Sequence, residues 1–415
     1  MINFGNIKSY PTFSSYQRLK TIKSKELTER KNLKKGTIKS YKDYLDKKNG
    51  FKCCNGKAVH EQCCYCLKWK NSLNENCLDV FSKYNCFPCP KWRNVLRVPN
   101  VWKSIHVSNK GQNISAIETE NAGEIYISSN GGDTWVDSGV RTGSSYGLWE
   151  DIVGTNSGTI YYVAASDNKI YTLTRNSSNE YSIETKTTLT DATIKLAMNL
   201  NGDKIFTAYN ATNKQEIGKI IDATNHEEVS GTDFPTADRD ANETWLAIET
   251  DDEGKNIVAI NSTRIHISKD SGGTFEKMIN DVPDGTYINT TISGDGEQII
   301  IIALYAGNKK LWITRRTDGF DVNSIFSKFE EITNNDDDFI NEWEFVKSSE
   351  NGSYIVASTT DGQVWLSSDY GNSWDNIKTF AGVIKDISIG IDDTNNKLRL
   401  VVAENKNLWS YTINI

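Results

Sequence analysis

The segment "SSNGGDTW" at residues 128–135 returns twice, as "SKDSGGTF" at 268–275 and as "SSDYGNSW" at 367–374. Each copy follows a short run of alternating residues that is typical of a strand, namely "EIYIS" at 124, "RIHIS" at 264 and "QVWLS" at 363. The copies therefore mark the same place in a repeating unit of strands.

Related strand ends occur between these copies and after the last one. Four more occur, so that seven strand ends lie about 40–55 residues apart: "KIYTL" at 169, "EIGKI" at 216, "KLWIT" at 310 and "NLWSY" at 407. Upstream of each lies a pair of predicted strands around a polar turn, as in "IHVSNKGQNISAI" (105–117). A unit of four short antiparallel strands that is repeated seven times predicts an all-β, seven-bladed β-propeller over residues 91–415, because stacked blades bury faces that a single sheet cannot.

The two ends of the repeat region predict how the ring closes. The last unit stops at "LWSYTINI" (408–415) without its outermost strand, and the first unit is preceded by "KWRNVL" (91–96). The latter resembles "SWDNIK" (373–378), which begins an outer strand. We expect residues 91–97 to pair with residues 408–415, because an open ring would leave two unpaired sheet edges.

The repeated segment follows the pattern S-x-[DN]-x-G-x-[TS]-[WF]. It resembles the Asp-box, or BNR, repeat of sialidases, sortilin-type receptors, some glycoside hydrolases and photosystem assembly factors. The matching positions are Ser128, Asn130, Gly132, Thr134, Trp135, Ser268, Asp270, Gly272, Thr274, Phe275, Ser367, Asp369, Gly371, Ser373 and Trp374. A fourth, decayed copy is expected at "TRNSSNEY" (174–181). The resemblance implies hairpins that are structural and lie away from any active site.

The residue types of the segment suit a hairpin between the third and fourth strands of a blade. The Asp or Asn side chain accepts hydrogen bonds from its own turn, and Gly permits a positive φ there. The hydroxyl groups tie the two arms together, and the terminal aromatic residue packs inward. Calcium binding or catalysis by Asp270 and Asp369 is the alternative interpretation, and we favour the structural one.

The arginines argue against a sialidase. The resemblance would require three arginines that clamp a carboxylate, a Tyr nucleophile with a Glu partner, an acid/base Asp, an Arg-Ile-Pro signature and six blades. The sequence has no Arg-Ile-Pro, and the arginines that follow residue 97 fall at unrelated positions within their units: Arg141, Arg175, Arg239, Arg264, Arg315, Arg316 and Arg399. We expect no catalytic residues and no enzymatic activity.

Two acidic segments offer the paired carboxylates that other glycosidases use. They are "TADRDANE" (236–243) and "TNNDDDF" (333–339), and the second could also bind a hard cation. Solvated loops are the favoured interpretation of both. His60, His106, His226 and His266 are scattered, and we expect His106 and His266 to be ordinary strand residues.

All eight cysteines lie within residues 53–90, which predicts a separate small module held by cross-links. Cys63, Cys66, Cys86 and Cys89 have the spacing of a four-thiolate zinc site. The adjacent pairs at 53–54 and 63–64 weaken the zinc interpretation, and eight cysteines within 37 residues suit four disulfides equally well. Zinc, disulfides and an unligated state stay open, and each makes the module structural.

The charge of the chain is divided unevenly. The net charge is −7, yet residues 1–92 carry 19 Lys and Arg against 7 Asp and Glu. Residues 1–52 therefore predict a basic arm, formed by short helices or by an extended segment. Such an arm could anchor the chain to acidic protein surfaces, bind nucleic acid with salt-sensitive affinity, or remain a solvated tail.

Together these features predict a non-catalytic scaffold that attaches to other proteins of a larger assembly through residues 1–90. The Lys-, Asn- and Ile-rich composition resembles that of structural proteins in large DNA virus particles, such as minor capsid components. The N-terminus lacks a secretory signal, and no apolar run approaches the ~20 residues of a membrane span. We therefore expect synthesis in a cytosol. The alternatives to the scaffold function are a carbohydrate-binding or glycosidase-like propeller and a nucleic-acid-binding protein.

Overall fold

The computed structural model describes residues 92–119, 123–142, 146–189, 195–211, 214–220, 226–228, 244–278, 285–315, 329–333, 342–392 and 395–415. These residues form 28 strands and no helix. Trp92–Ile415 make up one compact unit. Within the described part of the chain, no helix is long and apolar enough to cross a membrane.

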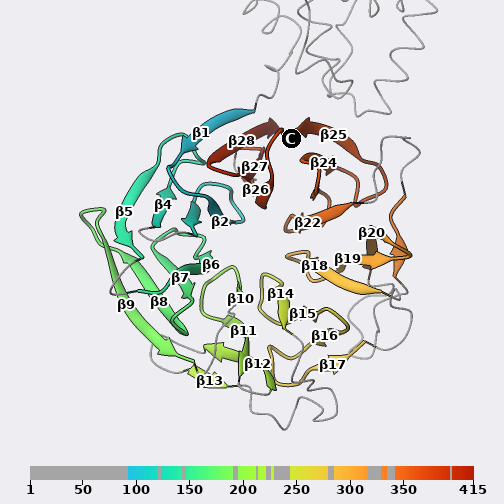
Figure 1. The fold of residues 1–415 in the computed structure, drawn as a ribbon, viewed down its shortest axis with the longest axis horizontal. Coiled ribbons are helices and arrows are strands. Elements are labelled where there is room, and N and C mark those ends of the chain that lie inside the picture. Colours follow the sequence, from blue (N-terminus) through green and yellow to red (C-terminus); the bar gives the residue numbers. More distant parts are fainter. Residues whose placement is uncertain are drawn as a thin grey trace, which may run out of the picture. The chain divides into compact units, whose positions relative to one another are not determined.

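Hydrogen bonding groups the described strands into seven four-stranded sheets, which surround a central axis as the blades of a β-propeller (Figure 1). Blade 1 is β2–β5, and each following blade takes the next four strands. The inner strands are β2 (Trp102–Val107), β6 (Trp149–Gly154), β10 (Lys195–Met198), β14 (Trp245–Thr250), β18 (Thr286–Ile292), β22 (Trp343–Ser348) and β26 (Ile384–Asp392). The number of sheets equals the number of repeats in the sequence.

The remaining strands lead outward from the axis in order. The second strands are β3 (Ile114–Glu118), β7 (Ile160–Ala165), β11 (Ile205–Ala211), β15 (Ile257–Asn261), β19 (Gln298–Tyr305), β23 (Ile355–Thr359) and β27 (Lys397–Glu404). The third strands are β4 (Glu124–Ser128), β8 (Lys169–Arg175), β12 (Lys214–Ile220), β16 (Ile265–Ser268), β20 (Asn308–Arg315), β24 (Gln363–Ser367) and β28 (Asn407–Asn414). The outer strands are β5 (Val136–Arg141), β9 (Tyr181–Thr188), β13 (His226–Glu228), β17 (Glu276–Lys277), β21 (Glu330–Glu331), β25 (Asp375–Thr379) and β1 (Arg93–Arg97).

Blade 7 joins the two ends of the propeller. Its strand order is β1-β28-β27-β26, and β1 pairs antiparallel with β28 from Arg93↔Ser410 to Arg97↔Asn407. Trp92 reinforces this seam, because its ring stacks on Tyr411 at 4.8 Å and its Nε1 donates to the Ile377 carbonyl of blade 6 at 3.2 Å. The predicted pairing of the chain ends is therefore present, and residues from Trp92 onward supply every strand of the ring.

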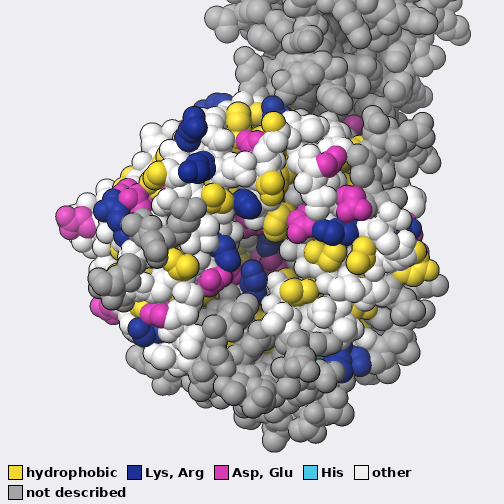
Figure 2. Space-filling view, in the orientation of Figure 1, with side chains coloured by type: hydrophobic (Ala, Val, Ile, Leu, Met, Phe, Trp, Pro, Cys, Tyr) yellow, Lys and Arg dark blue, Asp and Glu magenta, His cyan; other side chains and the backbone are white. Residues whose placement is uncertain are grey.

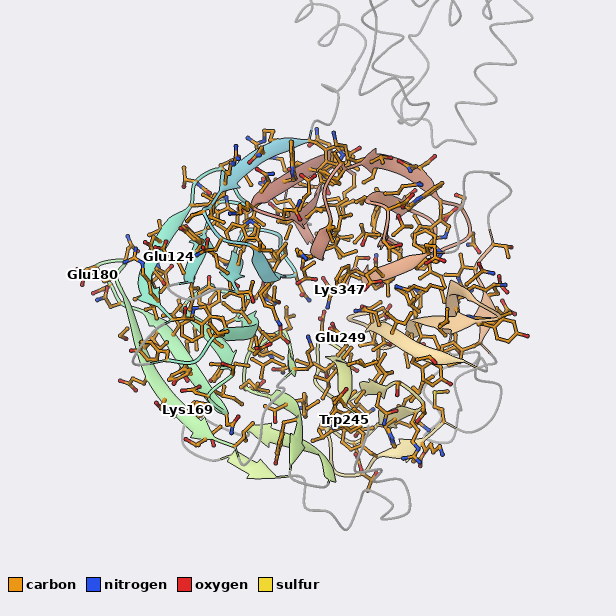
Figure 3. The ribbon with its side chains drawn as sticks, in the orientation of Figure 1. Glu124, Lys169, Glu180, Trp245, Glu249 and Lys347 are labelled. Atoms are coloured by element: carbon orange, nitrogen blue, oxygen red, sulfur yellow. The ribbon has the colours of Figure 1, made fainter. Side chains whose placement is uncertain are left out.

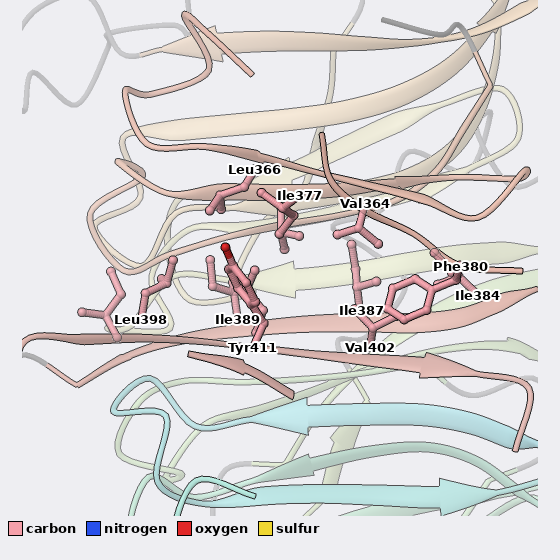
Figure 4. Close-up of a cluster of buried hydrophobic side chains, with 13 residues drawn as sticks. Val364, Leu366, Ile377, Phe380, Ile384, Ile387, Ile389, Leu398, Val402 and Tyr411 are labelled. Atoms are coloured by element: carbon pink, nitrogen blue, oxygen red, sulfur yellow. The ribbon is translucent and has the colours of Figure 1, made fainter. Parts of the chain in front are cut away.

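The core lies between the blades. Seven clusters of buried apolar side chains occupy the seven interfaces between neighbouring blades. Figure 4 shows the cluster between blades 6 and 7, where Val364 and Leu366 face Ile387, Ile389 and other residues of blade 7. The cluster between blades 7 and 1 has the same form, so the ring is packed without a gap at the seam.

A large side chain fixes the start of most inner strands. Trp102, Trp149, Trp245 and Trp343 occupy equivalent positions at the beginning of β2, β6, β14 and β22, and each is at most 1% exposed. Burial of such a ring contributes strongly to the core. These tryptophans therefore anchor the first residues of four of the seven inner strands in the core.

Candidate functional site

The inner strands surround a polar pocket of about 510 Å³ on the axis of the ring, which we call the axial pocket. Its ionisable lining residues are Lys103, His106, Asp151, Lys195, Glu249, Asp252, Lys347, Glu350, Lys385 and Asp386. Figure 2 shows basic and acidic side chains gathered around the centre of the displayed face. The volume lies within the range of about 300–1,000 Å³ that is usual for small-ligand sites.

Two lysines of the pocket lie at an irregularity that the inner strands share. In six inner strands the pairing register shifts one residue after the strand's first large side chain, for example between Trp102 and Ser104 and between Ile384 and Asp386. A bulge of this kind re-aims the extra residue. Lys103 and Lys385 are the extra residues of β2 and β26, and both line the axial pocket.

Two carboxylates of the pocket cap backbone groups of neighbouring blades. Asp386 Oδ2 of blade 7 accepts the Ile105 N–H of blade 1 at 2.7 Å. Asp151 of blade 2 accepts the Ser104 hydroxyl of blade 1 at 2.9 Å and the Leu196 N–H of blade 3 at 3.0 Å. Inner strands have a free edge at the axis, and these carboxylates satisfy part of it. They therefore join blades 7, 1, 2 and 3.

An ion pair crosses the pocket between two blades that are not neighbours in the ring. The Lys347 ammonium of blade 6 donates to Glu249 of blade 4, and blade 5 lies between them in the ring. Figure 3 shows the two residues near the centre of the ring. Burial opposes the charge of Lys347, but the carboxylates of Glu249 and Asp386 outweigh it and raise the pKa of the lysine. Lys347 is therefore protonated at neutral pH.

Two further groups of the pocket have shifted pKa values. Burial raises the pKa of Asp386 to about 6, although the Lys347 charge opposes the shift. Burial also lowers the pKa of His106 to about 4, and a hydrogen bond with the Gly154 backbone only partly offsets this change. His106 is therefore neutral at pH 7, and Asp386 titrates close to neutrality.

Tight turns gather at one end of the pocket, after the inner strands. In six of these turns the side chain of the first residue accepts the N–H of the sixth, at 3.0–3.3 Å, and the fourth residue is a glycine with φ between 63° and 74°. The first residues are Ser108, Thr155, Asn199, Asp251, Ser293 and Ser349. The side-chain cap and the positive φ together explain why this turn recurs.

These turns meet across the axis. Asn109 Nδ2 of blade 1 donates to Asp252 Oδ1 of blade 4 at 2.6 Å, a contact between blades three places apart in the ring. Gly294 makes the approach possible, since a Cβ there would lie 2.7 Å from the Asp252 carboxylate. Burial raises the pKa of Asp252 to about 6; the Asn109 bond opposes this rise, and the negative charge of Glu350 adds to it.

The charge of the pocket changes along the axis. Ile105 bonds to Asp386, and Val107, two residues later, bonds to Ser388, which is also two residues later. The strands β2 and β26 therefore run parallel to each other along the axis. Lys103, Lys195 and Lys385 lie at the starts of inner strands, and Asp252 and Glu350 lie in turns that follow them. One end of the pocket is therefore basic and the other acidic.

The residues that the sequence pattern singled out lie far from this pocket, in hairpins at the rim of blades 1, 4 and 6, which we call the rim hairpins (128–135, 268–275 and 367–374). In each hairpin the first Ser accepts the Gly N–H at 2.8–2.9 Å and donates to Asn130, Asp270 or Asp369 at 2.8–3.0 Å. The same acidic or amide side chain accepts the N–H four residues on at 2.8–2.9 Å. Their bonding groups are thus used inside one turn.

The other parts of the rim hairpins follow the same plan. Gly132, Gly272 and Gly371 have φ of 85°, 80° and 86°. The aromatic residues Trp135, Phe275 and Trp374 pack against the clusters between blades 7 and 1, blades 3 and 4, and blades 5 and 6. The segment 174–181 is also a hairpin, where Asn176 Oδ1 accepts the Glu180 N–H at 2.9 Å.

Sequence reasoning missed the residues of the axial pocket. His106 was expected to be an ordinary strand residue, yet it lines the pocket beside Lys347 and Asp151. The pattern [S/T/N/D]-x-x-G in six turns was the signal that could have located the acidic end. No comparable signal marks Asp151, Glu249, Lys347 or Asp386, because their partners belong to other blades.

Several predicted site residues lie outside the described residues. These are the eight cysteines, including the candidate zinc ligands Cys63, Cys66, Cys86 and Cys89, and nearly all of both acidic loops at 236–243 and 333–339. In the described part of the chain, no group of three His, Cys, Asp or Glu side chains is arranged to hold a metal ion. The zinc and disulfide hypotheses stay predictions.

Comparison with known proteins supports the fold. No family model and no curated protein sequence matches the chain. Among solved structures it is similar to YCF48 from Cyanidioschyzon merolae, with a TM-score of 0.57 and 14% identity over 77% of this chain and 98% of that chain. It is also similar to the Cps50 (Swd1) β-propeller domain of Myceliophteria thermophila, with a TM-score of 0.56 and 12% identity over 77% of this chain and 98% of that one.

These likenesses establish that the chain contains an all-β propeller. A propeller is consistent with a scaffold or interaction role, since its rigid ring presents many loops. At such low identity the comparison concerns the fold alone.

Proposed function

We propose that this chain is a non-catalytic interaction protein, in which the propeller is a rigid scaffold and residues 1–90 attach it to other proteins. The observation that carries the proposal is the closure of the ring by β1. All seven described sheets are complete with residues from Trp92 onward. The propeller therefore has no need of the preceding residues for its own strands, and they can serve attachment.

The arrangement of the axial pocket supports a non-catalytic role. Asp151 and Asp386 accept backbone N–H groups, and Glu249 is paired with Lys347. These three carboxylates thus already have partners within the ring, as a role in holding the blades together requires. A carbohydrate-binding role is less favoured, since the lining contains only two aromatic residues, Phe345 and the fully buried Trp102.

The mode of attachment follows from charge. Residues 1–92 carry an excess of 12 positive charges, whereas the whole chain has a net charge of −7. A basic arm of this kind binds acidic surfaces by long-range attraction. We propose that the Cys-rich module at 53–90 braces the arm, that the rim hairpins are Asp-box repeats, and that the assembly is a large DNA virus particle.

Co-purification of binding partners with the full chain and with two shortened chains tests the proposal. The full chain, a chain of residues 53–415 and a chain of residues 92–415 would be captured under identical salt, and the retained proteins and nucleic acids identified by mass spectrometry and nuclease treatment. We expect protein partners to be lost on removal of residues 1–52. Retention of the same partners by all three chains would contradict the anchoring role, and nuclease-sensitive retention would favour nucleic-acid binding.

A further inference from the structure

The Lys347–Glu249 ion pair in the axial pocket remains open to solvent. The side chains are 30% and 25% exposed, although protein surrounds the pocket on all sides of the ring. A sealed ion pair would exclude water from both partners. A small molecule that enters the pocket can therefore reach the ammonium and the carboxylate directly.

Blade 5, which lies between the two charged residues, contributes no charged side chain to the described lining. Asn289 and Thr291 of β18 line the pocket. Thr291 Oγ1 accepts the Ser348 N–H at 3.3 Å, whereas the Asn289 amide has no hydrogen-bond partner among the described residues. The wall between Lys347 and Glu249 thus offers an amide that can both donate and accept.

The lining presents charges of both signs. Four lysines can receive an anionic group: Lys103, Lys195, Lys347 and Lys385. Five carboxylates can receive a cationic group: Asp151, Glu249, Asp252, Glu350 and Asp386. A ligand with one charge would pair with one set only and lie near like charges of the other, which the surrounding protein screens poorly. A ligand that carries both charges close together satisfies both sets.

We propose that the axial pocket binds a compact zwitterion with a primary ammonium group, that is, a free α-amino acid. The ligand inserts into the ion pair, with its carboxylate on Lys347 and its ammonium on Glu249. Asp151 and Asp386 lie close enough for their charges to act on Lys347, so its ammonium group stays charged when the ligand's ammonium takes over Glu249. Asn289 bonds the ligand from the wall, and the 510 Å³ volume accommodates an amino acid.

Calorimetric titration of the full chain with single amino acids tests this inference. Alanine would be compared with propionate, which lacks the ammonium, with ethylammonium, which lacks the carboxylate, and with glycine betaine, which has no N–H donor. We expect saturable binding of at least one of the common amino acids, and affinities about tenfold or more weaker for the three analogues. Absence of binding by all amino acids, or equal binding of an analogue, would overturn it.

Matched substitutions locate the site. Lys347→Met and Glu249→Gln should each weaken binding by about tenfold or more, since each removes one half of the receiving pair. Lys169→Met is the control, because Lys169 pairs with Asp167 in blade 2, outside the pocket. Glu249→Gln preserves the shape of the side chain, and circular dichroism melting would verify its fold. Unchanged binding by folded Glu249→Gln, or equal loss in the control, would refute the assignment.

Discussion

The rim hairpins and the axial pocket both use carboxylates, and they use them differently. At the rim, Asp270 accepts the Thr274 N–H four residues away at 2.8 Å. At the axis, Asp386 accepts the N–H of Ile105, which is 281 residues away, at 2.7 Å. The rim carboxylates therefore stabilise single turns, whereas the axial carboxylates connect blades.

The two settings also move the pKa of the carboxyl group in opposite directions. At the rim burial would raise the pKa of Asp270, but hydrogen bonds from Thr274 and Ser268 lower it. At the axis burial dominates and raises the pKa of Asp386 to about 6, despite the charge of Lys347. Asp270, whose hydrogen bonds lie within its own turn, therefore stays acidic, while Asp386, which spans two blades, gives up part of its hydration.

Removal of an axial carboxylate should have the largest effect. Asp386→Ala leaves the Ile105 N–H without its acceptor and takes one counter-charge from Lys347, so we expect a loss of about 2–5 kcal/mol in the free energy of unfolding. Asp386→Asn keeps an acceptor oxygen and should cost less. Urea denaturation measures both, and equal stability of Asp386→Ala and the natural chain would show that the carboxylate does not connect the blades.

Removal of a rim carboxylate should cost less. Asp270→Ala deprives one turn of its acceptor, and we expect a loss of about 1–2 kcal/mol, as for other side-chain caps. Asp270→Asn should be nearly silent, because blade 1 has Asn130 in the same role, with Nδ2 donating to Thr134 Oγ1 at 2.8 Å. If Asp270→Asn is as destabilising in urea as Asp270→Ala, the charge matters more than the hydrogen bonds.

Acidification should change the free energy of unfolding by a smaller amount, and in opposite directions for two groups of the axial pocket. The pKa of Asp386 rises from 3.8 to about 6 on folding, so the folded state takes up a proton between these values and gains stability as the pH falls from 7 to 5. The pKa of His106 falls from 6.5 to about 4 on folding, so the unfolded state takes up a proton that the folded state does not. His106 therefore lowers the stability of the folded state over the same interval as the pH falls.

Unfolding free energies at the two pH values measure this contrast. Relative to the natural chain, Asp386→Asn should become more destabilised at pH 5 than at pH 7, and His106→Gln less destabilised, by about 1 kcal/mol each. Shifts of the same sign in both variants would refute the assigned protonation states.

The sequence predicted the rim well and the axis poorly, for a physical reason. The bonds of Ser128, Asn130 and Gly132 lie within a few residues, so residue type and spacing predict the turn. The repeat also predicted the closure at Arg93, because the strand missing from one end of the chain is present at the other. By contrast, Lys347 and Glu249 are 98 residues apart, and only the ring brings them together.

The closure of the propeller by Trp92–Arg97 underlies our proposal that residues 1–90 serve attachment. Amide hydrogen exchange of Asn407–Ser410, the part of β28 that pairs with β1, tests it most directly. Chains of residues 1–415, 92–415 and 98–415 would be compared. We expect equal protection in the first two chains and a loss of protection in the third, because its β28 edge is unpaired. Equal protection in residues 98–415, or lost protection in residues 92–415, would contradict it.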